Sequence, residues 1–238
     1  MGFRPSQGPA AAPAPTSTLS AAERNTIRLD GLANRYTHCR RCELASCGRK
    51  NIVWGKGAPE AAVMLITSTV NGYEDREGAI LDGPVYDIVI GAMLGAGFVP
   101  RRDVYATPLV KCVTPKKPNP QGELRRSHPE PEHIKACAPA LREQIEIIDP
   151  VVMVIHGRVA NEHLLGDKRP ITKYAGHWRP VAGRNCLAVS THNLMRIAMD
   201  ERGALAMEYR QLWLEVAARV NLLGRLWKPQ LPIFRSHT

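Results

Sequence analysis

Short apolar runs alternate with helical segments along this chain, and that alternation limits its fold more than any other feature. The runs cover residues 63–66, 104–110, 151–155 and 186–189, and each ends in polar residues. Helical patterns cover residues 21–36, 86–97, 132–148, a segment ending at 165, and 208–223. Strands that alternate with helices favour a parallel sheet with helices on both faces. We therefore expect an α/β fold of three layers, α/β/α, with a central four-stranded parallel sheet.

The two ends of the chain differ in composition from its middle. Residues 1–20 are rich in Pro, Ala and Ser, which predicts a disordered tail. Ser20 is also a candidate N-cap for the helix that follows it. Residues 225–238 are rich in proline and basic residues, which indicates an appendage. A single domain is expected over residues 21–224.

The charge balance indicates the class of partner. Lys and Arg number 32 against 22 Asp and Glu, which gives a net charge of +10. Such an excess favours a polyanion, nucleic acid before membrane. No apolar run reaches the length of a membrane span, and the N-terminus lacks a signal-peptide pattern. We expect a cytoplasmic protein that is a monomer, has no obligate protein partner, and keeps its cysteines as ligands or buried thiols rather than disulfides.

Polar residues follow each of the four expected strands, and these ends meet at one edge of a parallel sheet. They are Ser68–Asp75, Lys111-Cys112, His156–Arg158 and Ser190–Asn193. Ligands of open α/β sheets bind just beyond the carboxyl ends of the strands. The first of these segments carries the adjacent carboxylates Glu74 and Asp75, which suit either chemistry or a solvated loop.

Two further segments carry candidate ligands. Cys39 and Cys42 form a C-x-x-C, which can direct two thiolates at one metal ion or cluster. Residues 113–131 read as a long basic loop, and long loops in compact domains are usually functional or disordered. This loop contains Lys116, Lys117, Arg125, Arg126 and His128, which indicate phosphate contacts or a solvated surface.

Seven motifs lie between residues 36 and 220, namely HCRRCEL, VMLI with YEDREG after it, VYATPLVKC, HPEPEHIKAC, DPVVMVIHGRVANEHLLG, GHWRPVAG and STHNLMR. In sequence and order they resemble the uracil-DNA glycosylase superfamily, in particular the family-4 type that carries an iron–sulfur cluster. The resemblance implies a DNA glycosylase and a [4Fe–4S] cluster held by Cys39, Cys42, Cys112 and Cys137. Four thiolates also suit zinc, which the resemblance places second. Cys47 and Cys186 are then ordinary thiols.

Three positions of the expected base pocket depart from the family. The family's Glu after the first strand aligns with Ser68, and its uracil-reading Asn aligns with Pro108. The Phe that stacks on uracil aligns with the smaller Leu81. A pocket that loses its hydrogen-bonding group also loses discrimination for that base. The three changes predict a wider pocket that no longer reads uracil.

The resemblance assigns the remaining roles. His192 would donate a hydrogen bond to the departing base, since even a neutral imidazole offers one N–H. The negative charge or oriented water at the sugar would come from Asp75, Glu74 or Asn71. The base must leave the duplex, and Leu194 would fill the gap. Asn193 and Arg196 would contact the DNA beside it.

The predicted function is hydrolysis of the N-glycosidic bond of a modified pyrimidine in DNA. A bulky base such as glucosylated hydroxymethylcytosine of phage genomes would suit a wide pocket and would imply antiphage defence. The alternatives are an ordinary uracil-DNA repair glycosylase, a non-catalytic DNA-binding module, and an enzyme that edits modified bases. A fourth alternative is a covalently bonding relative, because Arg125-Arg126-Ser127-His128 resembles the insertion of one branch whose histidine bonds to the sugar.

Overall fold

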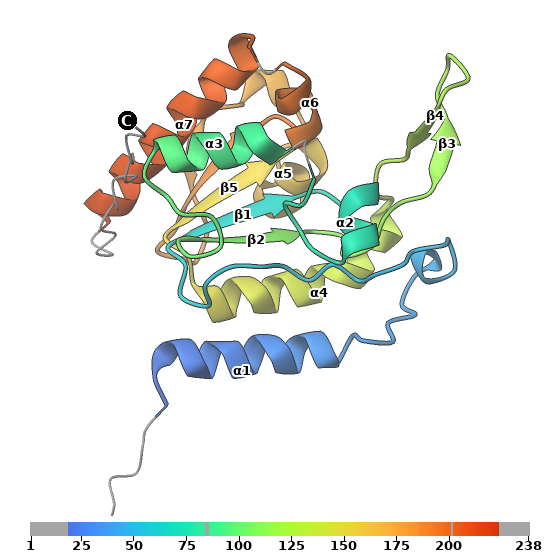
Figure 1. The fold of residues 1–238 in the computed structure, drawn as a ribbon, viewed down its shortest axis with the longest axis horizontal. Helices are drawn as coiled ribbons and strands as arrows, with labels where there is room; N and C mark the ends of the chain where they lie inside the picture. The colour runs from blue at the N-terminus through green and yellow to red at the C-terminus, as the bar shows by residue number, and fades with distance from the viewer. Residues whose placement is uncertain (1–18, 84–85, 201, 224–238) are drawn as a thin grey trace, which may run out of the picture.

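A five-stranded sheet organises the protein in the computed structural model, which describes residues 19–83, 86–200 and 202–223 (Figure 1). The strand order is β2-β1-β5-β7-β6. The strands are β1 (Val63–Thr67), β2 (Val104–Pro108), β5 (Val152–His156), β6 (Trp178–Pro180) and β7 (Leu187–Thr191). The four expected strands pair in parallel and so confirm the α/β prediction. The sheet has five strands rather than the expected four, because β6 pairs in antiparallel orientation with β7 at the sheet edge.

Alternating residues of the buried strands point to opposite faces of the sheet. In β1, Val63 and Leu65 join the core on one face, while Met64 and Ile66 join the core on the other. All five residues of this strand are buried. A strand buried on both faces reads as a continuous apolar run, which is why the sequence pattern identified it.

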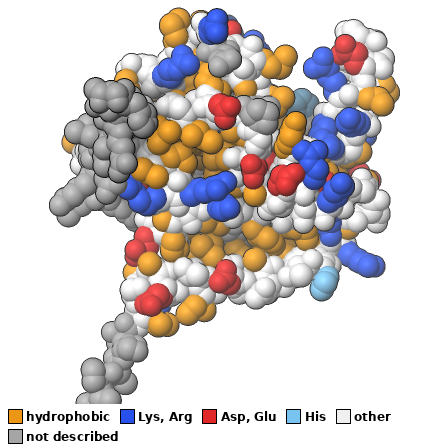
Figure 2. Space-filling model, viewed as in Figure 1, with side chains coloured by type: hydrophobic (Ala, Val, Ile, Leu, Met, Phe, Trp, Pro, Cys, Tyr) orange, Lys and Arg blue, Asp and Glu red, His pale blue; other side chains and the backbone are white. Residues whose placement is uncertain are grey.

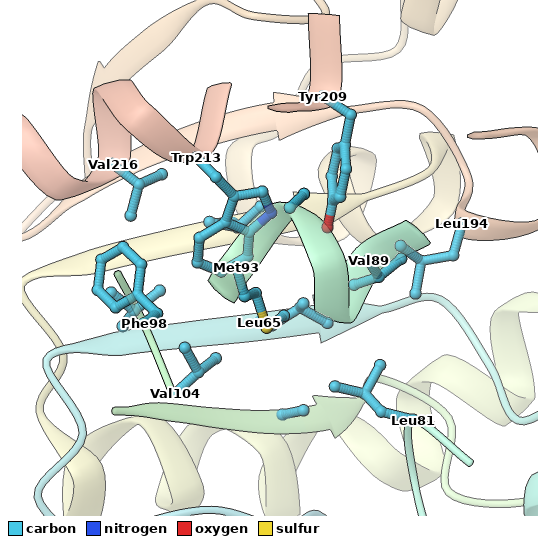
Figure 3. Close-up of a cluster of buried hydrophobic side chains, with 14 of the residues drawn as sticks. Leu65, Leu81, Val89, Met93, Phe98, Val104, Leu194, Tyr209, Trp213 and Val216 are labelled. Atoms are coloured by element: carbon cyan, nitrogen blue, oxygen red, sulfur yellow. The ribbon is translucent and has the colours of Figure 1, made fainter. Parts of the chain in front are cut away.

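Helices cover both faces of the sheet. One face carries α3 (Asp87–Gly95), α6 (Leu194–Met199) and α7 (Ala204–Leu222), and the other carries α4 (Pro131–Ile148) and α5 (Arg158–Leu165). The first of these cores centres on Trp213, whose ring lies 5.4 Å from Phe98 and 6.3 Å from Tyr209 between ring centroids (Figure 3). Aromatic rings at these separations and near-perpendicular angles attract each other beyond their burial.

An extra layer lies outside α4. Helix α1 (Ala21–Asn34) packs on α4 through a small core that includes Leu32, Tyr36, Ala140 and Ile147 (Figure 1). Ser20 caps α1 and forms a capping box with Glu23, as its sequence position predicts. The prediction of three layers therefore describes the sheet and its two covering faces, and α1 adds to it.

Two segments expected to be loops have regular structure instead. Residues 72–77, inside the first polar segment, form the short helix α2 (Gly72–Glu77). The basic segment contains an antiparallel ribbon of β3 (Lys116–Pro118) and β4 (Leu124–Arg126). The remaining short elements are the 3₁₀ turns η1 (Glu43–Ala45) and η3 (Ile171–Lys173).

Most of the expected tails lie outside the described residues, namely 1–18 of the first and 225–238 of the second. The described helices include none with the length and apolar character needed to cross a membrane.

Candidate active site and cluster-binding cysteines

Ser68 lies where the carboxyl ends of β1 and β5 meet. Its hydroxyl donates to the carbonyl oxygen of His156 (3.2 Å) and accepts from the backbone N–H of Ala160 (3.3 Å). Gly157, at a φ of 80°, leaves room for this hydroxyl, since a Cβ there would lie 3.1 Å from Ser68 Oγ. Ser68 is buried, and its hydroxyl joins β1 to the first turn of α5 rather than facing a substrate.

Asn71 and Glu74 form the N-terminal cap of α2. The Asn71 side-chain oxygen accepts from the N–H groups of Tyr73 and Glu74, and its amide nitrogen donates to the Tyr86 hydroxyl (2.8 Å). Glu74 accepts from Asn71 N, from Leu81 N and from the Tyr86 hydroxyl (2.7 Å). Burial raises the pKa of Glu74, although these three donors act against that shift. The network brings Asn71, Glu74 and Leu81 together, as parts of one supported turn.

Leu81 is held in a strained conformation by this network. Its φ of 57° lies in the left-handed region, which is uncommon for a residue with a branched side chain. The hydrogen bond from its N–H to Glu74 fixes the turn. Its side chain is buried in the same core as α3 (Figure 3).

Asp75 binds backbone on a different segment. Its carboxylate accepts from the N–H groups of Lys50 (3.0 Å) and Asn51 (3.2 Å), and only 6% of the residue is exposed. Asp75 therefore fastens α2 to the irregular segment that follows the cysteine motif. Within the described residues, no hydrogen bond joins Asp75 or Glu74 to His192.

Pro108 ends β2, which is the edge strand of the sheet, where the missing N–H of a proline is tolerated. Its carbonyl oxygen accepts from Lys111 Nζ at 2.6 Å. Lys111 is fully buried and also donates to Thr107 Oγ1 and Gln144 Oε1, both at 2.6 Å. Burial lowers the pKa of Lys111 to about 7. The ring of Pro108 offers no polar group to a base.

His192 follows β7 and borders a cavity of about 540 Å³. The cavity lies against the first turns of α7 and the turn at Ala175-Gly176, and His192 is 8% exposed. Burial lowers the pKa of His192, and the nearby Arg196 lowers it further, so the imidazole is neutral at pH 7. Its Nδ1 atom has no hydrogen-bond partner among the described residues. A neutral imidazole that retains an unused ring nitrogen is able to donate or accept a hydrogen bond there, depending on its tautomer.

The turn after His192 differs from the expectation in one residue. Asn193 caps α6 by accepting from Met195 N, and its side chain lies over Gly157 beside Ser68. Leu194 was predicted to fill the gap in DNA, but it is 5% exposed and packs in the core against α3 and α7 (Figure 3). The exposed apolar side chain of this turn is Met195, at 44%. Helix α6 is only six residues long, so its packing against α3 and α7 rather than a sequence pattern separates the two.

The predicted site residues do not surround one common cavity. His192 borders the cavity against α7, whereas Leu81 borders a second one, of about 530 Å³, between α3 and β2. The residues lining these two cavities have no member in common. The described structure brings together Ser68 with Asn193, and Asn71 with Glu74 and Leu81, and it places Asp75 and Pro108 with other partners.

The four predicted cysteine ligands converge from separate parts of the chain. Burial raises the pKa of Cys42, Cys112 (to about 11) and Cys137, and the thiols raise one another's values further. Cys39 is among the thiols that raise the pKa of Cys42 and of Cys137. Arg49 lowers the pKa of Cys112, because its guanidinium donates to Cys112 Sγ at 3.2 Å. The same guanidinium donates to the Cys39 carbonyl oxygen at 2.6 Å.

The type and number of these thiols suit an iron–sulfur cluster, and four thiolates also suit zinc. Zinc with four thiolates at about 2.3 Å holds its sulfur atoms roughly 3.8 Å apart. Among the described residues, no three of the cysteine sulfurs lie within 4.8 Å of one another. An iron–sulfur cluster is larger and is ligated by four cysteines. The four cysteines therefore supply the type and number of donors that such a cluster requires.

His133 ties this cysteine region together from the side. Its Nδ1 accepts from Glu130 N at 3.0 Å, so its Nε2 carries the proton and lies 3.3 Å from Glu43 Oε1. Glu43, Glu132 and His133 come within 4.8 Å of one another, as a metal site would require, but this imidazole has no free lone pair. His133 links Glu43, the residue after Cys42, to the first turn of α4, and Cys137 lies further along the same helix.

The basic residues of the expected loop lie on and beside the β3–β4 ribbon. Lys116, Lys117, Arg125 and Arg126 are exposed strand residues, and His128 is exposed two residues beyond β4. Lys and Arg side chains gather over the ribbon and the surface below it (Figure 2). Arg126 lies over the start of α2, where its Nη2 would be 3.0 Å from a Cβ at Gly72.

Comparison with known proteins identifies the family. The profile of the Uracil DNA glycosylase superfamily matches residues 54–215. The chain belongs to that superfamily. The match includes Cys112, Cys137 and His192, while Cys39 and Cys42 precede it.

Curated relatives give the same result. The Type-4 uracil-DNA glycosylase of Saccharolobus solfataricus is 34% identical over 139 residues, which cover 57% of this chain and 58% of that enzyme. That of Thermotoga maritima is 30% identical over 147 residues, 61% of this chain and 71% of the relative. A DNA polymerase of Bacillus phage SP01 is 27% identical over 130 residues, which are 55% of this chain and 13% of the polymerase. The match spans 58%, 57% and 63% of the first three relatives.

Two buried groups, His156 at the end of β5 and Tyr86 at the start of α3, were not predicted as site residues. His156 Nε2 lies 3.0 Å from the Tyr209 hydroxyl, and burial lowers the pKa of His156 to about 3. Tyr86 connects Asn71 to Glu74. The position of His156 at a strand end was a usable signal, whereas the role of Tyr86 depends on how α3 packs.

Proposed function

We propose that this protein is a DNA glycosylase that hydrolyses the N-glycosidic bond of a modified pyrimidine other than uracil and leaves an abasic site. Superfamily membership and the Type-4 relatives support the reaction. The single observation that supports the altered specificity is the hydrogen bonding of the Ser68 hydroxyl within the protein. This hydroxyl is engaged by His156 and Ala160, and Pro108 has no polar side-chain group, so neither position reads the edge of uracil.

His192 is the residue proposed to act on the leaving base. Cleavage of a glycosidic bond passes through an oxocarbenium-like sugar and places negative charge on the departing base. A neutral imidazole offers one N–H that donates a hydrogen bond to that charge. The lowered pKa of His192 keeps this form dominant at neutral pH. Asn71, Glu74 and Asp75 remain the proposed groups near the sugar, although their hydrogen bonds in this structure support the α2 turn.

The four cysteines are proposed to have a structural role. We propose that Cys39, Cys42, Cys112 and Cys137 hold a [4Fe–4S] cluster, whose contribution is to join distant segments covalently. Cys39 and Cys42 precede η1, Cys112 follows β2, and Cys137 belongs to α4. The strand ends that carry Pro108 and Lys111 are thereby fixed against α4.

DNA is the proposed partner, and its phosphates are the proposed contacts of Lys116, Lys117, Arg125, Arg126, His128 and Arg196. Biologically, excision of a hypermodified base would act against phages that carry it. Ordinary repair of uracil in DNA is the second candidate, since the curated relatives are uracil-DNA glycosylases by name.

An abasic-site assay tests these proposals. The wild type, His192→Ala and the control His163→Ala, which changes an exposed histidine of α5, are incubated with unmodified, uracil-containing, hydroxymethylated and glucosylated DNA, followed by alkali. We expect breaks in modified DNA alone, reduced on the order of 100- to 1,000-fold in His192→Ala. Breaks in uracil DNA would assign the protein to uracil repair. Tight binding with no breaks in any DNA would contradict both candidates.

A further inference from the structure

The β3–β4 ribbon is not covered by the rest of the protein. All six of its strand residues are exposed, and Leu124 is 66% exposed. The ribbon projects from the body beside α2 (Figure 1). A lone two-stranded ribbon is marginally stable in water. An exposed ribbon with a large apolar side chain is therefore a surface that suits a partner.

The cross-strand pairs of the ribbon include like charges, which destabilise it. Lys116 lies opposite Arg126, and Lys117 lies opposite Arg125. Like charges directly opposite each other destabilise a pair of strands. Two such pairs in succession concentrate positive charge, and a polyanion would remove the repulsion.

The two faces of the ribbon differ. Residues opposite each other share a face, and side chains alternate along each strand. One face carries Lys117 and Arg125, which pair with Glu130 (2.7 Å) and Glu123 (2.8 Å). On the other face, no carboxylate among the described residues pairs with Lys116 or Arg126. That face also carries the apolar pair Pro118 and Leu124 nearer the tip.

We infer that this second face, formed by Lys116, Pro118, Leu124 and Arg126, lies in a groove of the DNA duplex beside the extruded base. The inference rests on the proposed function and adds to it a contact with paired DNA. The major groove is about 12 Å wide and admits a two-stranded β-ribbon. In that groove apolar side chains contact the methyl group of thymine, while lysine and arginine contact guanine edges and phosphates.

The origin of the ribbon places it beside the strand ends. Val113, just before β3, pairs in parallel with Val70, which follows Ser68 at the end of β1. Arg126 at the other end of the ribbon donates to Thr114 O and lies over the start of α2. A duplex that presents a base to this edge of the sheet therefore meets the ribbon on the β2 side.

Binding of the full-length protein to DNA tests the inference. Affinity for a duplex with a central abasic analogue, and for the same sequence as a single strand, is measured by fluorescence anisotropy from about 50 to 200 mM salt. The variants are Lys116→Gln and Leu124→Ser. Their matched controls on α1 are Arg28→Gln and Ile27→Ser, since Ile27 is 58% exposed and Arg28 is an exposed cation.

We expect Lys116→Gln to lower the salt slope for the duplex by about 0.9, the value for one lost phosphate contact. Leu124→Ser should weaken duplex binding several-fold with an unchanged slope. Single-strand binding and both α1 controls should match the wild type. Equal effects of Lys116→Gln and Arg28→Gln, together with wild-type duplex binding by Leu124→Ser, would overturn the inference.

The same preparations separate this inference from the proposed function. Abasic sites formed by a wild type whose ribbon variants bind normally would overturn the ribbon contact alone. Ribbon-dependent duplex binding without abasic sites would overturn the glycosylase alone. If the wild type forms no complex with duplex DNA, the ribbon contact is overturned, whatever the abasic-site assay shows.

Discussion

Arg49 donates a hydrogen bond from its guanidinium to Cys112 Sγ at 3.2 Å, while its other terminal nitrogen reaches the carbonyl oxygen of Cys39. One side chain thus contacts two of the four proposed cluster ligands from different parts of the chain. Hydrogen bonds to ligand sulfur, together with net charge, set the reduction potential of iron–sulfur clusters. Arg49 is therefore placed to act on the proposed cluster through Cys112.

Replacing Arg49 by Gln should keep the iron content but make the reduction potential more negative, since a positive charge and a sulfur hydrogen bond are removed. Redox titration followed by visible absorbance measures the shift. Arg49→Lys, which retains the charge, should recover part of it. An unchanged potential in Arg49→Gln would contradict a role at the sulfur.

Cys137→Ser should lose most of the iron and the broad visible absorbance, and it should lower the thermal midpoint. Cys137 lies within α4 among buried side chains, so the vacated site also disturbs that helix. Cys47→Ser is the matched control, because Cys47 is exposed and outside the proposed ligand set. Full iron content in Cys137→Ser, or stoichiometric zinc in the wild type, would refute the [4Fe–4S] assignment.

Met195 and Leu194 should respond differently to truncation. Leu194→Ala removes a buried core side chain and should cost about 2–5 kcal/mol in the free energy of unfolding. Met195→Ala should leave stability unchanged and lower kcat/KM on duplex substrate, because an exposed apolar side chain three residues after His192 is lost. Urea denaturation and steady-state assays measure the two effects. Normal turnover by Met195→Ala would remove this residue from DNA contact.

His156 should make the protein less stable in acid. Its pKa is about 3 in the folded state, against an ordinary value near 6.5, so the unfolded chain binds the proton more readily. The stabilising contribution is complete above about pH 6.5 and decreases as the pH falls from 6.5 towards 3. Urea denaturation at several pH values measures the slope.

The variant His156→Gln should flatten that slope, since its amide is uncharged throughout and keeps a hydrogen-bonding group near Tyr209. His177→Gln, which alters an exposed histidine, serves as the control. Identical slopes in the wild type and His156→Gln would show that another group governs the acid transition.

The parallel strands were predictable because burial on both faces leaves uninterrupted apolar runs such as 63–66. β6 was not, since Trp178, Arg179 and Pro180 become a strand only by pairing with β7. Helix α2 had a readable signal in the capping pair Asn71 and Glu74 and in the closing Gly78, but its six residues give no periodicity. The chemical candidates were harder, because whether a carboxylate faces solvent or backbone depends on tertiary packing.

The family resemblance located the cysteines and His192, which short motifs carry. It also suggested Leu194 from its place in such a motif, where the packing of α6 against α3 and α7 decides which neighbour is exposed. The specificity prediction rests on substitutions at Ser68, Pro108 and Leu81. The structure shows in addition that the Ser68 hydroxyl joins the end of β1 to the first turn of α5.

The outer position of α1 gives the molecule an order of unfolding. Helix α1 packs against α4, and the Arg35–Glu143 ion pair across them is exposed and therefore contributes little. Cys39 and Cys42 follow this helix directly, so a bound cluster would fasten the outer layer to Cys112 and Cys137. Loss of the cluster would then release α1 as a local unit before the sheet opens. Its amide hydrogens would exchange early, and the N-terminal layer would become the first target of a protease in protein damaged by oxidation.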